Sequence, residues 1–326
     1  MNLPYVIRLV ILCTAAFFLI HTALALAVSL IAGRAIRLAE GMKASTAARF
    51  LFAVRILPLL LTLLAVFGLC VPSYLWLEPG ASPEKVGLVC VLAALLGALA
   101  CGISMRRVVS AIAGTMSYVN RCEQAGHPTM LPGDNSPVLV LDQDVPVLAI
   151  AGVVHPRLVV SRRVVQSLSP EQIDAALSHE RGHQISRDNF KRLLILFTPD
   201  VFPFVRGFTP LERGWAKFSE WAADDHAAAG DSHRALCLAA ALVTVAKMNA
   251  RPQLPSLVAT LMADDRDLSE RIDRLLHSQP VTPTSFPSLP GVVSSAAALL
   301  SGAFALMVVW PGSLAAVHQA LERLVR

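Results

Sequence analysis

The stretch SHERGH, residues 178–183, determines how the rest of the chain is interpreted. It places His179 and His183 four residues apart, with Glu180 directly after the first histidine. Residues at i and i+4 share one face of an α-helix, so two imidazoles at this spacing can bind one zinc ion. The carboxylate of Glu180 would lie beside water on that ion and could take its proton. The spacing predicts a helix with His179 and His183 as ligands and Glu180 as general base.

The residues before this motif mark the start of a helix. Ser169 is a typical N-cap, Pro170 suits the first helical position, and Gln172 can complete a capping box. These signals predict a helix from Pro170 to about Gln184, with the histidine pair inside it.

A second predicted helix, roughly Pro210 to Ala229, carries the expected third ligand. Glu220 and Asp224 fall on one of its faces. Glu220 would complete a His, His, Glu site with a position left for water, and Asp224 would accept a hydrogen bond from a liganding imidazole. Two such carboxylates also occur on ordinary solvated helix faces. His226 is a competing ligand, although it points away from Glu220.

No residue type in the sequence identifies the group that stabilises an oxyanion. The three tyrosines all precede the zinc-binding motif, which argues against a tyrosine in this role. The remaining donors are interpreted first as ordinary surface residues, and the role stays open: His226, His233, Arg234 and Arg271.

Short β-rich runs precede the first helix and predict a small sheet. They are Val138–Leu141, Pro146–Val154 and Arg157–Val160, separated by Asp, Gly and Pro. The run Pro146–Val154 has two interpretations. It could be an exposed edge strand that holds an extended peptide by main-chain hydrogen bonds, or a strand of the core. The residues that bind a substrate are not identified.

The composition indicates a membrane protein, because 55% of the 326 residues are hydrophobic and 16% are charged. A helix needs about 20 apolar residues to cross a bilayer. Four stretches reach that length, and we predict four transmembrane helices, although buried core helices are the alternative. The first stretch could also be a signal peptide, but a retained anchor is preferred. The stretches are Leu9–Ala32, Ile56–Leu77, Val86–Ser104 and Val292–Trp310.

Charged loops predict the orientation of these helices. The first loop carries five basic residues against Glu40, whereas the second carries Glu78, Glu84 and Lys85. By the positive-inside rule the first loop is cytoplasmic. The same rule accounts for the net charge of +5 without nucleic-acid binding, and the six cysteines form no bridge pattern. The expected fold is mainly α and crosses the membrane several times. Its organisation is a three-helix membrane region (1–107), a cytoplasmic α+β metallopeptidase domain (108–290), and a fourth membrane helix with a short tail (291–326).

Several of these motifs resemble the peptidase part of the BlaR/MecR type of β-lactam-sensing receptors, which are membrane gluzincins. The resemblance covers about Pro146 to Asp224. It is more distant to the HtpX and CAAX prenyl protease group, whose Arg-Ile pair has a counterpart in Arg271-Ile272. That group has a His-Pro-Pro element where this chain has Met262-Ala263-Asp264-Asp265. The receptor-like motifs are Val153–Val160, Leu168–Gln172, His179–His183 and Arg187–Asn189.

The resemblance implies a zincin-like domain facing the cytoplasm of a bacterial inner membrane. In the receptors a penicillin-binding sensor domain follows the fourth span. Here about 16 residues follow Trp310, so direct β-lactam sensing is not expected. We therefore expect a zinc metalloendopeptidase with one zinc ion, embedded in the lipid bilayer. Its expected substrate is a cytoplasmic repressor, another protein or the chain itself, and a separate sensor subunit is an expected partner. The alternatives are an HtpX-like quality-control protease and a non-proteolytic signalling or scaffold protein that zinc stabilises.

Overall fold

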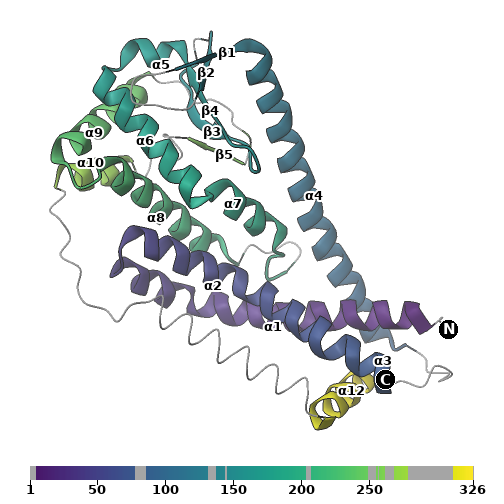
Figure 1. Cartoon of the computed structure of the whole chain (residues 1–326). Coiled ribbons are helices and arrows are strands. Elements are labelled where there is room, and N and C mark those ends of the chain that lie inside the picture. The colour runs from purple at the N-terminus through teal and green to yellow at the C-terminus, as the bar shows by residue number, and fades with distance from the viewer. Residues whose placement is uncertain are drawn as a thin grey trace.

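Three long apolar helices form one end of the molecule (Figure 1). They are α1 (Tyr5–Glu40), the continuous helix made of α2 (Ala44–Ala65), a π-helical turn (Val66–Cys70) and α3 (Val71–Leu77), and α4 (Leu88–Ala125). Each is long and apolar enough to cross a membrane, in agreement with the first three predicted spans. The computed structural model describes residues 5–77, 86–130, 137–143, 145–202, 207–248, 255, 257–260, 268–277 and 311–325. The fourth predicted span, Val292–Trp310, lies outside the described residues and precedes α12 (Pro311–Val325).

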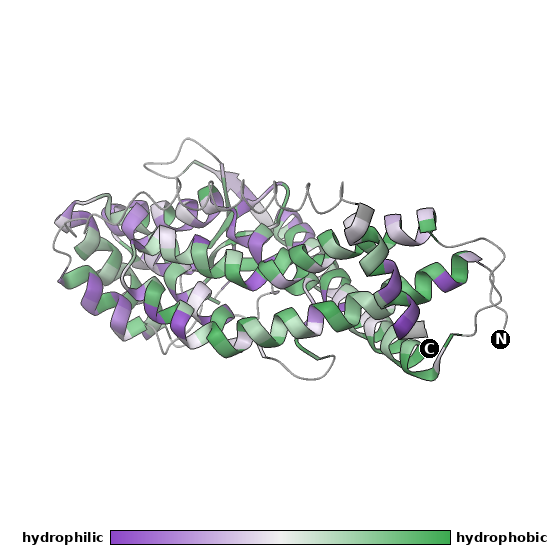
Figure 2. Ribbon diagram, turned by 90° about the horizontal axis from the view of Figure 1, so that it is seen from below, coloured by the Kyte–Doolittle hydropathy of each residue, from purple (hydrophilic) through white to green (hydrophobic). Residues whose placement is uncertain are grey.

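Small residues bring the apolar helices together, and large ones face outward. A Cβ atom on Gly97 of α4 would lie 2.8 Å from the carbonyl oxygen of Thr14 on α1, so these two helices cross where glycine removes the obstacle. Such crossings at small residues are typical of membrane helices. Leu30, Phe67 and Val89 are among the many large apolar residues left exposed on these helices. Figure 2 shows this apolar end, with hydrophilic residues more frequent at the other end.

A five-stranded mixed sheet packs beside the far end of α4, which runs directly into its first strand. The strand order is β1-β2-β4-β3-β5, and β2 and β4 are parallel while the other pairs are antiparallel. The three β-rich runs become β2, β3 and β4, close to their predicted bounds. The strands are β1 (Gly126–Thr129), β2 (Val138–Leu141), β3 (Leu148–Ala151), β4 (Arg157–Ser161) and β5 (Val258–Thr260).

The two predicted site helices form with nearly the expected bounds. The first, α6 (Pro170–Ser186), begins with the predicted capping box between Ser169 and Gln172. The second, α8 (Thr209–Ala228), ends where Ala229 and Gly230 adopt positive φ. The remaining helices are α5 (Arg162–Ser167), α7 (Asp188–Phe197), α9 (Ser232–Lys247) and α10 (Leu268–Leu276).

The described residues are mainly helical, as predicted, and two of their hydrophobic cores meet at α8. One core joins the sheet to α6, α8 and α9 through residues such as Val160, Leu177 and Leu238. The other joins α8 to α1 and α2, with Leu51 packed in the same cluster as Trp215 and Phe218. Helix α8 therefore belongs to both cores and connects the apolar helices to the sheet. Helix α4 passes the predicted domain boundary at residues 107 and 108 without a break.

Basic side chains from all three apolar helices bind the segment that leads into α8. His21 of α1 donates from Nε2 to the carbonyl oxygen of Pro199 at 3.2 Å. Arg55 of α2 donates to Glu212 at 2.9 Å, and Arg107 of α4 lies 3.2 Å from Asp200. The first turn of α8 is thus held by α2, and the residues that follow α7 are held by α1 and α4.

Candidate metal centre

Helix α6 places both histidines of the motif in the interior. His179 is 0% exposed and His183 is 2% exposed, and their ring centroids lie 4.9 Å apart. Helix α6 also carries Ala175, Ala176 and Leu177, which are buried in the core with the sheet and α9. This packing fixes the rotation of α6, and both imidazoles lie next to Glu220 of α8 on one helix face, as the i and i+4 spacing predicted.

Helix α8 brings Glu220 to the two imidazoles. Its Oε2 lies 3.5 Å from Nε2 of His179, and its Oε1 lies 3.5 Å from Nε2 of His183. One ligand atom from each of the three residues lies within 4.8 Å of the others, which is a spacing that one metal ion could bridge. The structure thus brings together the three predicted ligands.

The close approach of α6 and α8 depends on a glycine inside the motif. A Cβ atom on Gly182 would lie 3.0 Å from the Cα of Ala223. Because the obstacle is backbone, a larger residue would have to separate the two helices. Gly182 therefore sets the distance between His183 and Glu220.

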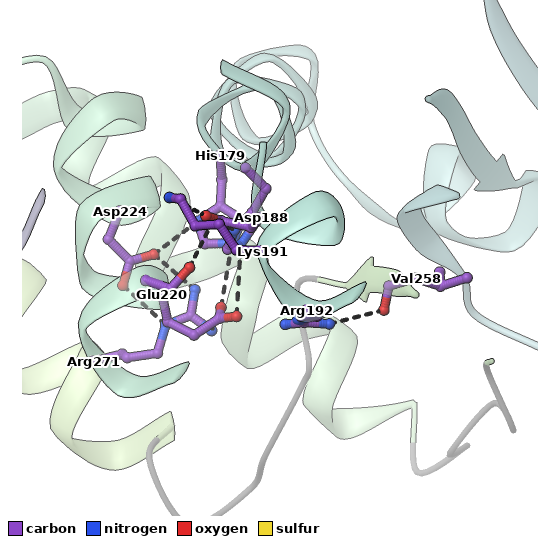
Figure 3. Close-up of polar contacts among 10 residues, drawn as sticks. His179, Asp188, Lys191, Arg192, Glu220, Asp224, Val258 and Arg271 are labelled. Carbon is purple, nitrogen blue, oxygen red and sulfur yellow. Dashed lines mark hydrogen bonds and ion pairs between the residues drawn. The ribbon is translucent and has the colours of Figure 1, made fainter. Parts of the chain in front are cut away.

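Each imidazole has a second carboxylate at Nδ1, whereas its Nε2 atom faces Glu220. Figure 3 shows Asp188, Glu220 and Asp224 near His179, with Arg271 beside the carboxylates of α8. Nδ1 of His179 lies 2.9 Å from Oδ1 of Asp224, so the predicted carboxylate is next to this imidazole, although the contact lacks the alignment of a hydrogen bond. Nδ1 of His183 donates to Oδ2 of Asp188 at 2.8 Å, and Ser219 and Lys191 also donate to this carboxylate. An imidazole that donates from Nδ1 presents the lone pair of Nε2 to a metal.

Asp188 was not predicted as a site residue. The sequence contains a signal for it, since Asp188 belongs to the receptor-like motif Arg187–Asn189. In the structure Asp188 follows Arg187, which adopts the left-handed conformation (φ 54°) where α6 ends. That turn directs the start of α7 back toward His183. A turn of this kind was not expected at an arginine, because glycine or asparagine usually occupies such positions.

The interpretation of Arg271 as an ordinary surface residue is wrong. Arg271 of α10 is 3% exposed and donates to both carboxylate oxygens of Asp224, at 2.9 and 2.7 Å. Its Nη1 also lies 3.2 Å from Oε2 of Glu220. It holds two neighbouring carboxylates of α8 in place. The Arg-Ile pair in the sequence drew attention to Arg271, but it did not predict this contact.

Glu180 lies between the two histidines in the sequence, and its side chain is fully buried. Within the described part of the chain neither of its carboxylate oxygens has a hydrogen-bond partner. Burial raises the pKa of Glu180 to about 7, although the neighbouring imidazoles of His179 and His183 act to lower it. A carboxyl group of this pKa can both accept and give up a proton near neutral pH.

The same environment shifts the pKa of the ligands. Burial lowers the pKa of His183, but the charge of Glu220 and the hydrogen bond with Asp188 outweigh it and raise the pKa to about 10. Burial acts to raise the pKa of Glu220, but His183 and Arg271 hold it well below its usual range. The site without a metal therefore favours a cationic imidazole at His183 beside the anionic carboxylate of Glu220, and a metal cation could replace the proton of that imidazole.

The residues fit a metal ion. Nε2 of His183, Nε2 of His179 and both Glu220 oxygens are buried and have no hydrogen-bond partner among the described residues. Buried polar atoms that lack a hydrogen-bond partner are rare in proteins, and a bound ion can satisfy them. His226, the competing ligand, and its neighbour Asp225 are exposed on α8. The donor set is thus two imidazoles and one carboxylate.

The interpretation of the Pro146–Val154 run as an exposed edge strand is wrong, and its alternative as a core strand is confirmed. All four residues of β3 are buried. The strand lies between β4 and β5, with Ile150 paired to Leu158 on one side and to Ala259 on the other. Strand β5 was not predicted, because it pairs with β3 across more than 100 residues of sequence.

Comparisons with known proteins add no relative. No family model matches the chain, and neither the curated proteins nor the solved structures yield a match.

Proposed function

We propose that this chain is a zinc-dependent endopeptidase of a membrane, which cleaves a protein substrate by attack of water on a peptide bond. One observation carries the proposal. The ligand atoms of His179, His183 and Glu220 surround one point, and the unpartnered carboxylate of Glu180 lies on the same buried helix. Three protein ligands with a position left for water are typical of catalytic zinc sites, whereas structural sites have four.

The residues of the chain divide the work as follows. A bound zinc ion supplies Lewis acidity, which polarises a carbonyl group and makes water more acidic. Glu180 takes the proton from the attacking water and delivers it to the leaving amine nitrogen. Asp188 and Asp224 hold the two imidazoles in orientation, and Arg271 holds Asp224 and Glu220.

The membrane setting is part of the proposal. Three helices could span a bilayer, and the resemblance of the motifs to gluzincin receptors supports a fourth span at Val292–Trp310 and a zincin-like domain. The basic first loop supports a cytoplasmic position for the metal site in a bacterial inner membrane. The substrate would then be a cytoplasmic protein such as a repressor, or the chain itself, and a separate sensor subunit could control cleavage.

The test is a comparison of wild type with Glu180→Gln and Glu171→Gln. Glu171 is exposed on the first turn of α6, so its variant controls for loss of a carboxylate on the same helix. We expect Glu180→Gln to keep one zinc per chain and to lose cleavage by a factor of more than about 100, the lower end of what a general base contributes. Proteins cut by wild type and Glu171→Gln, but not by Glu180→Gln, would be the substrates.

The ligand assignment has its own test. Glu220→Ala should lower zinc occupancy, whereas His226→Ala should not. If wild type cleaves nothing beyond the background seen with Glu180→Gln while zinc still stabilises the protein, the scaffold function replaces the peptidase.

A further inference from the structure

Asn189, the residue after Asp188, connects the metal site to the sheet. Its side chain is 7% exposed and reaches from the start of α7 to strand β3. Nδ2 donates to the carbonyl oxygen of Ile150 at 3.1 Å and to that of Gly152 at 2.9 Å. Asp188 of α7 thus orients His183, and the next residue, Asn189, binds β3.

The two carbonyl groups that Asn189 binds lie on the β5 side of β3, away from β4. The carbonyl group of Val147 points toward β4, because its oxygen accepts from the backbone N–H of Ser161 at 2.8 Å. Backbone groups alternate in direction along a strand, so the carbonyl group of Ile150 points the other way, toward β5. The carbonyl group of Gly152, just beyond the strand, lies on the same side, because both accept from Nδ2 of Asn189. The pairing with β5 ends at Ala151, and Gly152 lies beyond it. Asn189 therefore binds β3 on the side that faces β5, at the point where the pairing with β5 ends.

These contacts fix which way the amide of Asn189 faces. An oxygen atom cannot donate to a carbonyl group, so the nitrogen must be on the side of Ile150 and Gly152. Both hydrogens of Nδ2 are then used. Oδ1 is buried and has no hydrogen-bond partner within the described residues. A buried acceptor of this kind is unfavourable unless something else donates to it.

We propose that Oδ1 of Asn189 accepts a main-chain N–H group of the polypeptide substrate, which lies extended beside the end of β3. A side-chain amide that binds a strand by its nitrogen presents its oxygen much as a further strand would present a carbonyl group. Every residue of a peptide except proline has the matching N–H donor, so this contact fixes the position of the substrate without selecting its side chains. The inference rests on the proposed peptidase function and names a substrate-positioning residue for it.

The position of Asn189 suits this role. Asp188 binds Nδ1 of His183, so the neighbouring Asn189 is on the His183 side of the metal site, and α6 itself contacts both β3 and β5. A peptide held at that point would have one residue fixed relative to the ligands. Such fixation is what brings a scissile bond into a reactive position.

The experiment measures peptide binding separately from cleavage. A fluorescent ten-residue peptide is enriched from a random pool on zinc-loaded Glu180→Gln protein in detergent, and each amide N–H is then replaced in turn by an ester oxygen. We expect one ester to weaken binding about tenfold, which is the size of one neutral hydrogen bond. In Glu180→Gln/Asn189→Ala the unmodified peptide should bind about tenfold more weakly, and the same ester should cost nothing further.

Asn189→Asp separates this role from a structural one. Like Asn189→Ala it removes both donors to β3, but it keeps an acceptor at the same place. The penalty of the ester should therefore persist in the Asp variant and vanish in the Ala variant. Zinc content and melting temperature, measured for both, report any damage to the fold.

The outcomes distinguish the two proposals. If no peptide is enriched, or no single ester is coupled to Asn189, the acceptor serves a buried water or nothing, and this inference is overturned. If peptides are cleaved by wild type without that coupling, the peptidase function stands alone. If the coupling is found but no peptide is cleaved, the binding site stands and the peptidase function falls.

Discussion

Nε of Arg55 on α2 donates to Oε1 of Glu212 on α8 at 2.9 Å, and this ion pair links the apolar helices to the helix of the third ligand. The two partners are unequal, because the side chain of Arg55 is 1% exposed and that of Glu212 is 37% exposed. The guanidinium also lies over the ring of Phe208, 4.1 Å from its centroid. The pair therefore fixes the start of α8 against α2.

This inequality predicts different costs for removing each partner. Glu212→Ala leaves a buried cation unpaired and should destabilise the protein by about 3–5 kcal/mol. Arg55→Met leaves a carboxylate that water can reach and should cost less. Thermal unfolding in one detergent measures both. Arg162→Ala, which breaks an exposed pair with Asp142, should change stability by less than about 1 kcal/mol. Equal losses for Arg55→Met and Glu212→Ala would contradict this prediction.

Asp188→Asn should weaken zinc binding about 10- to 100-fold, because partners behind liganding histidines contribute that much to metal affinity. The amide can still accept from His183, but it lacks the charge that favours a metal-bound imidazole. Competition with a chromophoric chelator measures the affinity. Asp174→Asn on the same helix as His183, where Asp174 pairs with Arg234, serves as the control. An unchanged affinity for Asp188→Asn would exclude Asp188 from the site.

Arg271→Met should destabilise the protein more without zinc than with it. Arg271 neutralises Glu220 and Asp224. The substitution removes this positive charge, and in the metal-free protein the two buried carboxylates are left without it. A bound divalent cation would supply positive charge in its place. Melting temperatures with zinc and with a chelator should therefore differ more for Arg271→Met than for wild type. A loss that is equal in both conditions would show that Arg271 acts only on packing.

Zinc affinity should fall as the pH is lowered. In the metal-free site the pKa of His183 is raised to about 10, so this imidazole carries a proton at neutral pH that zinc must displace. Lowering the pH favours the proton over the metal, and the apparent affinity should fall at least about tenfold per pH unit between pH 8 and pH 6. Calorimetry in buffers of different ionisation enthalpy counts the protons released. Release of fewer than about one proton per zinc would be the opposite result.

Gly182→Ala should reduce zinc occupancy, because the added Cβ atom would meet the Cα of Ala223 at 3.0 Å and move α6 away from α8. Overpacking of this kind usually costs about 1–3 kcal/mol. Gly102→Ala is the matched control, since a Cβ atom there has no described neighbour within 4 Å. Metal analysis of the two purified variants tests the difference. Full occupancy in Gly182→Ala would mean that the helices have room to adjust.

The parts of the site that the sequence predicts are those that local rules control. The positions of His179 and His183 follow from helical periodicity, and the bounds of α6 and α8 follow from their start signals and from Gly230. Glu220 could be inferred because a metal site with two histidines needs a partner, and a helix with a suitable face was available.

The parts that the sequence does not predict depend on contacts between distant elements. Arg271 reaches Asp224 from α10, and its burial cannot be inferred from the polar residues around it. Strand β5 is three residues long and is stabilised by pairing with β3, so no local pattern marks it. The same pairing reversed the expectation that β3 is an edge strand.

The unbroken helix α4 has a consequence for where cleavage could take place. Its 38 residues, at about 1.5 Å each, give a rod of roughly 57 Å. A bilayer accounts for about 30 Å of such a length. Gly126 begins β1 directly after the helix, so no flexible linker separates this rod from the sheet. If α4 crosses a membrane, the height of the site above the lipid is fixed, and only those bonds of a substrate that come to that height could be cut.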